Sequence, residues 1–135
     1  MRGENTNKTN TFVVDTSFVL AYLLPDEKVR HVDKMFSMLE ENKISIVAPY
    51  LLVYETMNGL RSAVMQKRQS AKTAELILDS FLNMGILYKK IDEEAVFRLA
   101  ITKSITAYDA TYVWLAKSQN ISLLTLDEKL ENILK

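Results

Sequence analysis

Short apolar runs alternate with longer segments whose apolar residues recur at helical spacing. The apolar runs predict buried strands at residues 12–14, 44–47, 86–91 and 121–126. The longer segments predict helices at 17–24, from 26 to about 42, from about 50 towards 68, from 70 to a stop at 85, after 92, at 107–118 and after 127. Strands separated by helices need crossover connections, so we expect a three-layer α/β/α domain with a central parallel sheet of about four strands.

The domain organisation follows from the length and the first residues. A chain of 135 residues has the size of one domain with one core. Residues 1–11 are polar and rich in asparagine, so we expect a polar N-terminal tail there and a single domain over 12–135. No apolar run approaches the roughly 18 residues of a membrane helix, and the start lacks the apolar region of a signal peptide. We therefore expect no contact with a membrane and a cytoplasmic location.

The composition narrows the available chemistry. The chain has no cysteine, which excludes thiolate nucleophiles, disulfides and the usual structural zinc sites. Its only histidine is His31, so a histidine-rich metal site is excluded as well. Seventeen basic residues balance seventeen acidic residues, so any contact with nucleic acid must come from a local patch. Carboxylates, hydroxyls and lysines remain as candidate functional groups.

Four carboxylates stand alone in otherwise uncharged stretches of the chain: Asp15, Glu55, Asp109 and Asp127. A buried lone carboxylate is unfavourable unless a cation or several hydrogen-bond donors compensate its charge. Two of the four follow predicted strands, and the other two lie near the starts of predicted helices. Ligands of parallel sheets bind outside the carboxyl ends of the strands, so we expect all four acids at that edge.

A set of carboxylates without histidine or cysteine suits the hard cations Mg²⁺ and Mn²⁺. Without a metal ion, the same groups repel one another and raise one another's pKa. A metal ion held in this way can polarise a phosphodiester and activate water. The four acids are therefore a candidate catalytic metal site.

Each acid also has a purely structural explanation. Asp15 and Asp127 stand where they can cap the helices that follow them, and the segment 106–109 has the spacing of a capping box. Glu55 is the hardest to explain in this way, because it lies in an apolar helix between Leu51 and Gly59. For single residues both explanations stay open, whereas the set as a whole favours a site.

The motifs around these acids resemble those of a known family. They are Val13-Val14-Asp15-Thr16-Ser17, Glu55 in its apolar helix, Ala107-Tyr108-Asp109-Ala110 with Leu115-Ala116, and Leu124-Thr125-Leu126-Asp127. In this order and at this chain length they resemble PIN-domain ribonucleases, most closely the small VapC-type toxins of toxin–antitoxin pairs. The resemblance covers about residues 12 to 132.

This resemblance implies an Mg²⁺-dependent endoribonuclease, with Mn²⁺ as a substitute, that cleaves RNA. It also implies a homodimer and a VapB-type antitoxin protein as partner. By match, Asp15, Glu55, Asp109 and Asp127 would form the catalytic, metal-binding site. Ser17 and Thr125 would be polar neighbours that orient it.

Two further groups of residues are candidates for contact with RNA. Basic residues at the junction of two predicted helices either contact phosphates or form an ordinary solvated face; they are Arg61, Lys67, Arg68 and Lys72. Tyrosines near the acidic segments either stack on unpaired bases or pack in a core or interface; they are Tyr50, Tyr54 and Tyr108.

Other functions fit less well. A phosphotransferase of the haloacid-dehalogenase type needs a second aspartate two residues after Asp15, where this chain has Ser17. A response-regulator receiver needs an acidic neighbour beside the first aspartate, and Asp15 has none. An RNA-processing nuclease of the PIN family, or a PIN-like scaffold that binds RNA or protein without cleaving, remains an alternative.

Overall fold

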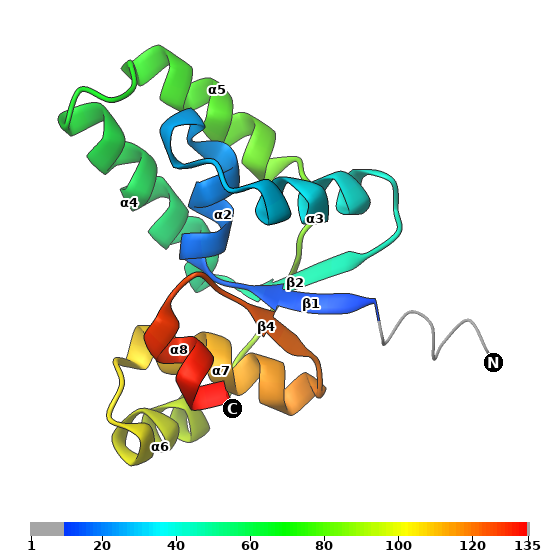
Figure 1. The fold of residues 1–135 in the computed structure, drawn as a ribbon. Helices are drawn as coiled ribbons and strands as arrows, with labels where there is room; N and C mark the ends of the chain where they lie inside the picture. Colours follow the sequence, from blue (N-terminus) through cyan, green and yellow to red (C-terminus); the bar gives the residue numbers. More distant parts are fainter. Residues whose placement is uncertain (1–9, 135) are drawn as a thin grey trace.

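A four-stranded parallel sheet forms the centre of the molecule (Figure 1). The computed structural model describes residues 10–134. Its strands are β1 (Thr11–Val14), β2 (Ser45–Pro49), β3 (Leu87–Lys89) and β4 (Ser122–Leu124), in the spatial order β3-β2-β1-β4. All three neighbouring pairs are parallel. The edge strands β3 and β4 are shorter than the predicted segments 86–91 and 121–126.

Helices cover both faces of this sheet. Figure 1 shows α2 (Thr16–Leu23), α3 (Arg30–Glu40), α4 (Leu51–Met65) and α5 (Ala71–Leu82) on one side of the sheet. On the other side lie α6 (Glu93–Lys103), α7 (Ala107–Gln119) and α8 (Glu128–Leu134). The predicted three-layer α/β/α fold is therefore confirmed. Within residues 10–134, no helix is long and apolar enough to cross a membrane.

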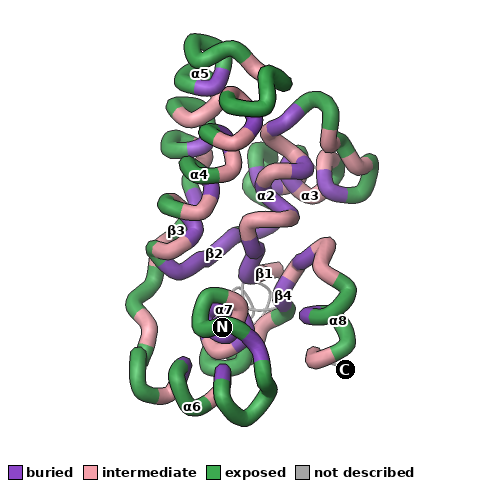
Figure 2. The backbone as a smooth tube through the Cα atoms, turned by 90° about the vertical axis from the view of Figure 1, so that its left-hand side faces the viewer, coloured by how far each residue is buried: buried purple, intermediate pink, exposed green. Residues whose placement is uncertain are grey.

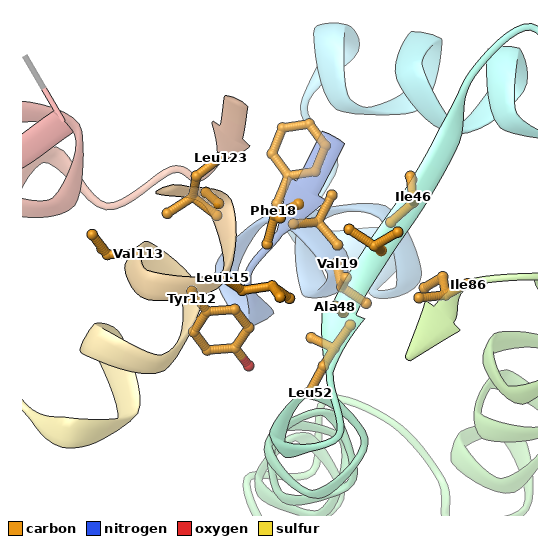
Figure 3. Packing of buried hydrophobic residues seen from close by; sticks show 14 of the residues in the cluster. Phe18, Val19, Ile46, Ala48, Leu52, Ile86, Tyr112, Val113, Leu115 and Leu123 are labelled. Atoms are coloured by element: carbon orange, nitrogen blue, oxygen red, sulfur yellow. The ribbon is translucent and has the colours of Figure 1, made fainter. Parts of the chain in front are cut away.

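The core lies where the helices press on the two faces of the sheet. The inner strands carry fully buried residues, as the purple segments of β1 and β2 in Figure 2 show. Aromatic and aliphatic side chains from both helical layers pack against them (Figure 3); among them are Phe18, Val19, Leu52, Tyr112, Val113 and Leu115. Continuous apolar runs suit strands that are covered on both faces, which is why the sequence pattern predicted them.

Helix caps account for several of the boundaries. The side chains of Ser70, Asp92 and Thr106 each accept a hydrogen bond from a backbone N–H in the first turn of α5, α6 and α7. The helix starts predicted at these positions are confirmed. Asn120 ends α7 with φ of 57°, a left-handed conformation that asparagine tolerates well. These local signals fix the start and end of α7, which carries part of the site.

One predicted cap is wrong. The sequence pattern places the start of a helix at Asp26, but residues Pro25–Glu27 form a short 3₁₀ turn, and α3 begins later without a side-chain cap. The carboxylate of Asp26 instead accepts a hydrogen bond from Arg68 Nη1 at 2.8 Å, and Glu27 accepts another at 3.0 Å. The side chain that would have capped the helix is thus paired with a charged donor that follows the end of α4.

Close packing of α2 on α4 brings two parts of the site together. Gly59 of α4 faces Leu20 of α2, and a Cβ atom at position 59 would lie 2.5 Å from Leu20 Cδ1. Only a residue without a side chain fits this approach without displacing Leu20. One turn earlier on α4, Glu55 reaches Thr16 at the start of α2.

We expect Gly59→Val to lower the free energy of unfolding by about 1–3 kcal/mol, because the added side chain overpacks the contact with Leu20. Urea unfolding of the two proteins measures the difference. If the contact is the cause, Leu20→Ala will be less destabilising in the Gly59→Val background than in the wild type. Additive effects of the two substitutions would contradict this explanation.

Candidate active site

The four predicted acids line one cavity of about 570 Å³. Asp15 follows β1, Glu55 lies on α4, Asp109 lies in the first turn of α7, and Asp127 follows β4. The chain thus brings together carboxylates from four separate segments at the carboxyl edge of the sheet. Whether they act as a catalytic set remains a prediction.

Asp15 is almost fully buried, with 5% of its surface exposed, and three donors hold it. The hydroxyl of Ser17 donates to Oδ1 at 2.7 Å, the hydroxyl of Thr125 donates to Oδ2, and Phe18 N–H donates to Oδ1 at 3.1 Å. The last bond makes Asp15 the N-cap of α2, so the structural explanation of this residue is also correct. Burial raises the pKa of Asp15, and the hydrogen bonds from Thr125 and Ser17 oppose that shift.

The same two hydroxyls hold the loop after β4 against the start of α2. Leu126 N–H donates to Ser17 Oγ at 3.0 Å, and Asp127 N–H donates to Thr125 Oγ1 at 3.0 Å. Asp127 Oδ1 accepts from Lys129 N–H at 2.9 Å, which satisfies a backbone donor at the start of α8. Asp127 therefore serves as a cap and lines the cavity as well.

Glu55 is held by two hydroxyls from other elements. Tyr112 Oη donates to Glu55 Oε1 at 2.6 Å, and Thr16 Oγ1 donates to the same oxygen at 2.7 Å. The ring of Tyr112 lies in the core with 2% of its surface exposed (Figure 3), while its hydroxyl reaches the cavity. Burial, together with the hydrogen bond to Glu55, raises the pKa of Tyr112 above its ordinary value, so the phenol remains a donor.

Tyr112 is a residue of the site that was not predicted from the sequence. Tyr112 lies three residues after Asp109, which places both side chains on the same face of α7. The surrounding residues are apolar, so Tyr112 looks like an ordinary core aromatic. The only hint at its second role is the hydroxyl itself, because a buried hydroxyl needs a hydrogen-bond partner.

Asp109 is the acid whose pKa is raised by burial and by all three of the other carboxylates. Its backbone N–H donates a hydrogen bond to Oγ1 of the cap residue Thr106 at 3.0 Å, and its side chain lines the cavity. Burial raises the pKa of Asp109, and three nearby carboxylates raise it further; they are those of Asp127, Asp15 and Glu55. Within residues 10–134 no lysine, arginine or histidine forms an ion pair with any of the four acids. The charge of Lys129 offsets a small part of the raised pKa of Asp109, but no basic side chain of the described residues pairs closely enough with the acids to neutralise their repulsion.

The donor chemistry of this cavity fits a hard divalent cation. The candidate ligands are carboxylate and hydroxyl oxygens and the amide oxygen of Asn58, which matches the preference of Mg²⁺ and Mn²⁺ for oxygen. In the described part of the chain, no three acidic or histidine side chains lie close enough together to hold one ion jointly. Mg²⁺ usually keeps several water ligands and takes only one or two carboxylates, so this spacing is compatible with it.

The basic residues predicted to contact RNA do not line the cavity. Arg61 follows the cavity-lining residue Gly59 on α4, and Lys67 and Arg68 follow the end of that helix. Arg68 is engaged in the ion pairs with Asp26 and Glu27. Contact between these residues and RNA remains a prediction.

The three tyrosines predicted as candidates for contact with RNA are exposed at or beside the acidic cavity. Tyr50, Tyr54 and Tyr108 are all more than half exposed. Tyr54 and Tyr108 line the acidic cavity, and Tyr108 also lines a neighbouring cavity of about 670 Å³ together with Tyr50. Exposed rings at the rim of a cavity are available to stack on bases or to pack against another protein.

Comparison with known proteins places this arrangement in a family. The sequence model of the PIN domain matches residues 12–134. The chain belongs to the PIN domain family. The predicted resemblance is thus confirmed, and the fold described above is that of a PIN domain.

Similar proteins carry VapC names. Ribonuclease VapC3 of Pyrobaculum aerophilum is 28% identical over 119 residues, which cover 87% of this chain and 90% of the relative. Ribonuclease VapC9 of Mycobacterium tuberculosis is 28% identical over 127 residues, covering 89% of this chain and 88% of the relative. Their similarity extends over nearly the whole PIN domain.

Solved structures show the same fold. PAE2754 from Pyrobaculum aerophilum superposes with a TM-score of 0.72 at 27% identity, covering 90% of this chain and 84% of that chain. Mycobacterium tuberculosis VapC20, described as a toxin that cleaves the sarcin-ricin loop, gives a TM-score of 0.65 at 15% identity. The match covers 90% of this chain and 94% of the VapC20 chain. At this low identity the similarity shows the fold alone.

We expect Asp109→Asn to raise the melting temperature of the metal-free PIN domain by a few degrees at neutral pH. Because the folded protein raises the pKa of Asp109, it binds that proton more tightly than the unfolded chain does. Stability due to this group therefore falls as the pH rises from the ordinary aspartate range, about pH 4, towards neutrality. The amide side chain of the variant cannot ionise, so its advantage should grow over the same range.

Thermal unfolding in the presence of EDTA, at about pH 4 and about pH 7, tests this expectation. Glu75→Gln on the exposed side of α5 is the control for removing one negative charge elsewhere. An Asp109→Asn protein that melts no higher than this control at neutral pH would show that repulsion in the cavity does not limit stability.

Proposed function

We propose that the protein is a metal-dependent endoribonuclease that hydrolyses RNA phosphodiester bonds and acts as the toxin of a VapBC-type pair. The observation that carries this proposal is the gathering of four carboxylates in one cavity without a basic partner in the described part of the chain. The ribonuclease names of its relatives support it.

In this proposal, three of the acids bind the metal and the fourth supports them. Asp15, Glu55 and Asp109 would between them hold one or two Mg²⁺ ions, or Mn²⁺ in their place, and Asp127 would complete or orient the set. When bound, the cation would act as a Lewis acid on the phosphodiester and make a water molecule more acidic. Ser17 and Thr125 keep the Asp15 carboxylate in one orientation through their hydrogen bonds.

The substrate needs contacts outside the acidic cavity, because the carboxylates repel its phosphates. Tyr54 and Tyr108 stand at the rim, where their exposed rings can stack on unpaired bases. Arg61, Lys67 and Arg68 remain candidates for phosphate contacts further along the RNA. A single-stranded RNA is the substrate that suits this combination of exposed aromatic rings and an open cavity.

The mode of cleavage is open to a direct test. A further relative, from Pyrobaculum aerophilum, is named Exonuclease VapC9; it is 28% identical over 119 residues, covering 88% of this chain and 82% of the relative. A circular RNA has no ends, so only an endonuclease cuts it. Cleavage of a circular substrate supports our proposal, whereas degradation of linear RNA alone favours an exonuclease.

We expect purified protein to cleave total RNA with Mg²⁺ or Mn²⁺, and EDTA to abolish the cleavage. Asp15→Asn and Asp109→Asn should each reduce cleavage to background while leaving the fold intact, because each removes a charged ligand but little volume. Gel analysis of the RNA and circular dichroism of the proteins measure both effects. Asp79→Asn on α5 is a control away from the cavity, and wild-type rates in both site variants would refute the nuclease assignment.

The VapB-type antitoxin is the protein partner in this proposal. A small reading frame directly upstream of the gene would favour a toxin over an RNA-processing enzyme. Its product should bind this protein and inhibit RNA cleavage. A cytoplasmic location belongs to the same proposal, because the RNA and the antitoxin would both be found there.

The proposed homodimer has a candidate interface beside the acidic cavity. Tyr50 and Phe97 line the neighbouring cavity and are 56% and 62% exposed. Ile101, one turn after Phe97 on α6, is 64% exposed. Exposed large apolar side chains grouped in this way are typical of protein–protein interfaces.

We expect Phe97→Asp to convert the dimer to a monomer, because the interface would have to bury an unpaired charge. Sedimentation velocity on both proteins measures the change. Leu76→Asp on α5 is the matched control, since Leu76 is 66% exposed but lies away from this surface. A wild-type monomer, or a Phe97→Asp protein that remains dimeric, would reject this interface.

A further inference from the structure

Glu55 differs from the other acids in how it is anchored. Both of its donors, Tyr112 Oη and Thr16 Oγ1, bind the same oxygen, Oε1. The two hydroxyl oxygens are themselves 3.0 Å apart, so the three atoms form a compact triangle. Among the residues that the structure describes, none donates a hydrogen bond to the second oxygen, Oε2. One oxygen of Glu55 is thus held by the protein, and the other is left for a ligand in the cavity.

The donors come from elements that are themselves fixed. Tyr112 has its ring in the core and can move its hydroxyl only if the core moves with it. Thr16 is the first residue of α2, directly after Asp15. Glu55, in contrast, has a long side chain with several rotatable bonds, and ordering such a side chain is entropically unfavourable. The two hydroxyls restrict it before any ligand binds.

We propose that Tyr112, assisted by Thr16, is a positioning residue that holds the Glu55 carboxylate ready to bind a divalent cation. This inference rests on the proposed function, since it assigns Glu55 to the metal site. Tyr112 itself touches neither the metal ion nor the RNA. Its effect on the reaction passes through Glu55, in the way that hydrogen-bond partners of metal ligands orient them.

The chain offers unusually close controls for this proposal. Within the described residues, the hydroxyls of Tyr88 and Thr56 are buried but have no hydrogen-bond partner. Tyr88→Phe and Thr56→Val therefore remove a buried tyrosine or threonine hydroxyl without removing a bond to an acid. They match Tyr112→Phe and Thr16→Val in chemistry, and only the latter two change the contacts of Glu55.

The test measures Mn²⁺ binding to the metal-free protein by calorimetry. We expect Tyr112→Phe and Thr16→Val each to weaken binding roughly 10- to 100-fold, the range found for partners of metal ligands. Thr16→Ser should restore near wild-type affinity, because it restores the hydroxyl. Tyr88→Phe and Thr56→Val should leave the affinity unchanged. Melting curves show whether every variant is folded.

A double-mutant cycle decides whether Tyr112 acts through Glu55. In the Glu55→Ala background, Tyr112→Phe should have almost no further effect on the Mn²⁺ affinity. A loss that persists in full in this background would overturn the proposal, because Tyr112 would then act independently of Glu55. Equal Mn²⁺ affinities for Tyr112→Phe and Tyr88→Phe would overturn it as well.

Cleavage assays add a second signature. Excess Mn²⁺ should restore the cleavage rate of Tyr112→Phe, because only the affinity for the ion is impaired, whereas Asp15→Asn should stay inactive. A wild-type protein that cleaves RNA and binds Mn²⁺, with a Tyr112→Phe variant indistinguishable from it, overturns this inference alone. A wild-type protein that neither binds Mn²⁺ nor cleaves RNA overturns the proposed function together with it.

Discussion

The mutual repulsion of four carboxylates in one cavity is the constraint on which the rest of the site depends. Folding brings them together from the ends of β1 and β4 and from α4 and α7, and no basic side chain in the described part of the chain pairs with them. The raised pKa of Asp109 reflects burial first and this crowding second. The rest of the domain must therefore supply enough stability to hold the acids in place.

Neutral hydroxyls stabilise the charged form of individual acids without cancelling the charge. Thr125 and Ser17 serve Asp15, while Tyr112 and Thr16 serve Glu55. A lysine or arginine in their place would neutralise the acids and compete with a bound cation. Hydroxyl donors instead fix the direction of each carboxylate and leave the cavity negative. This choice of partner distinguishes a cavity that can attract a cation from an ordinary structural ion pair.

The four acids and their common edge could be predicted because each is alone in an uncharged stretch and adjoins a strand end or a helix start. The helix caps at Ser70, Asp92 and Thr106 depend on local sequence and were predictable for the same reason. Asp26 and Tyr112 depend on partners 42 and 57 residues away, and no local pattern records such partners. Long-range pairing therefore marks the limit of what the sequence alone could indicate.

The start of α2 links the fold to the site. Its first two residues, Thr16 and Ser17, serve different acids, so a shift of this helix would disturb both at once. Gly59 allows α4 to lie close to α2 and thereby brings Glu55 within reach of Thr16. Stability and site geometry therefore depend on the same contacts. In the proposed function, replacing an acid would relieve repulsion but remove a metal ligand, which is the exchange of stability for function that active sites commonly show.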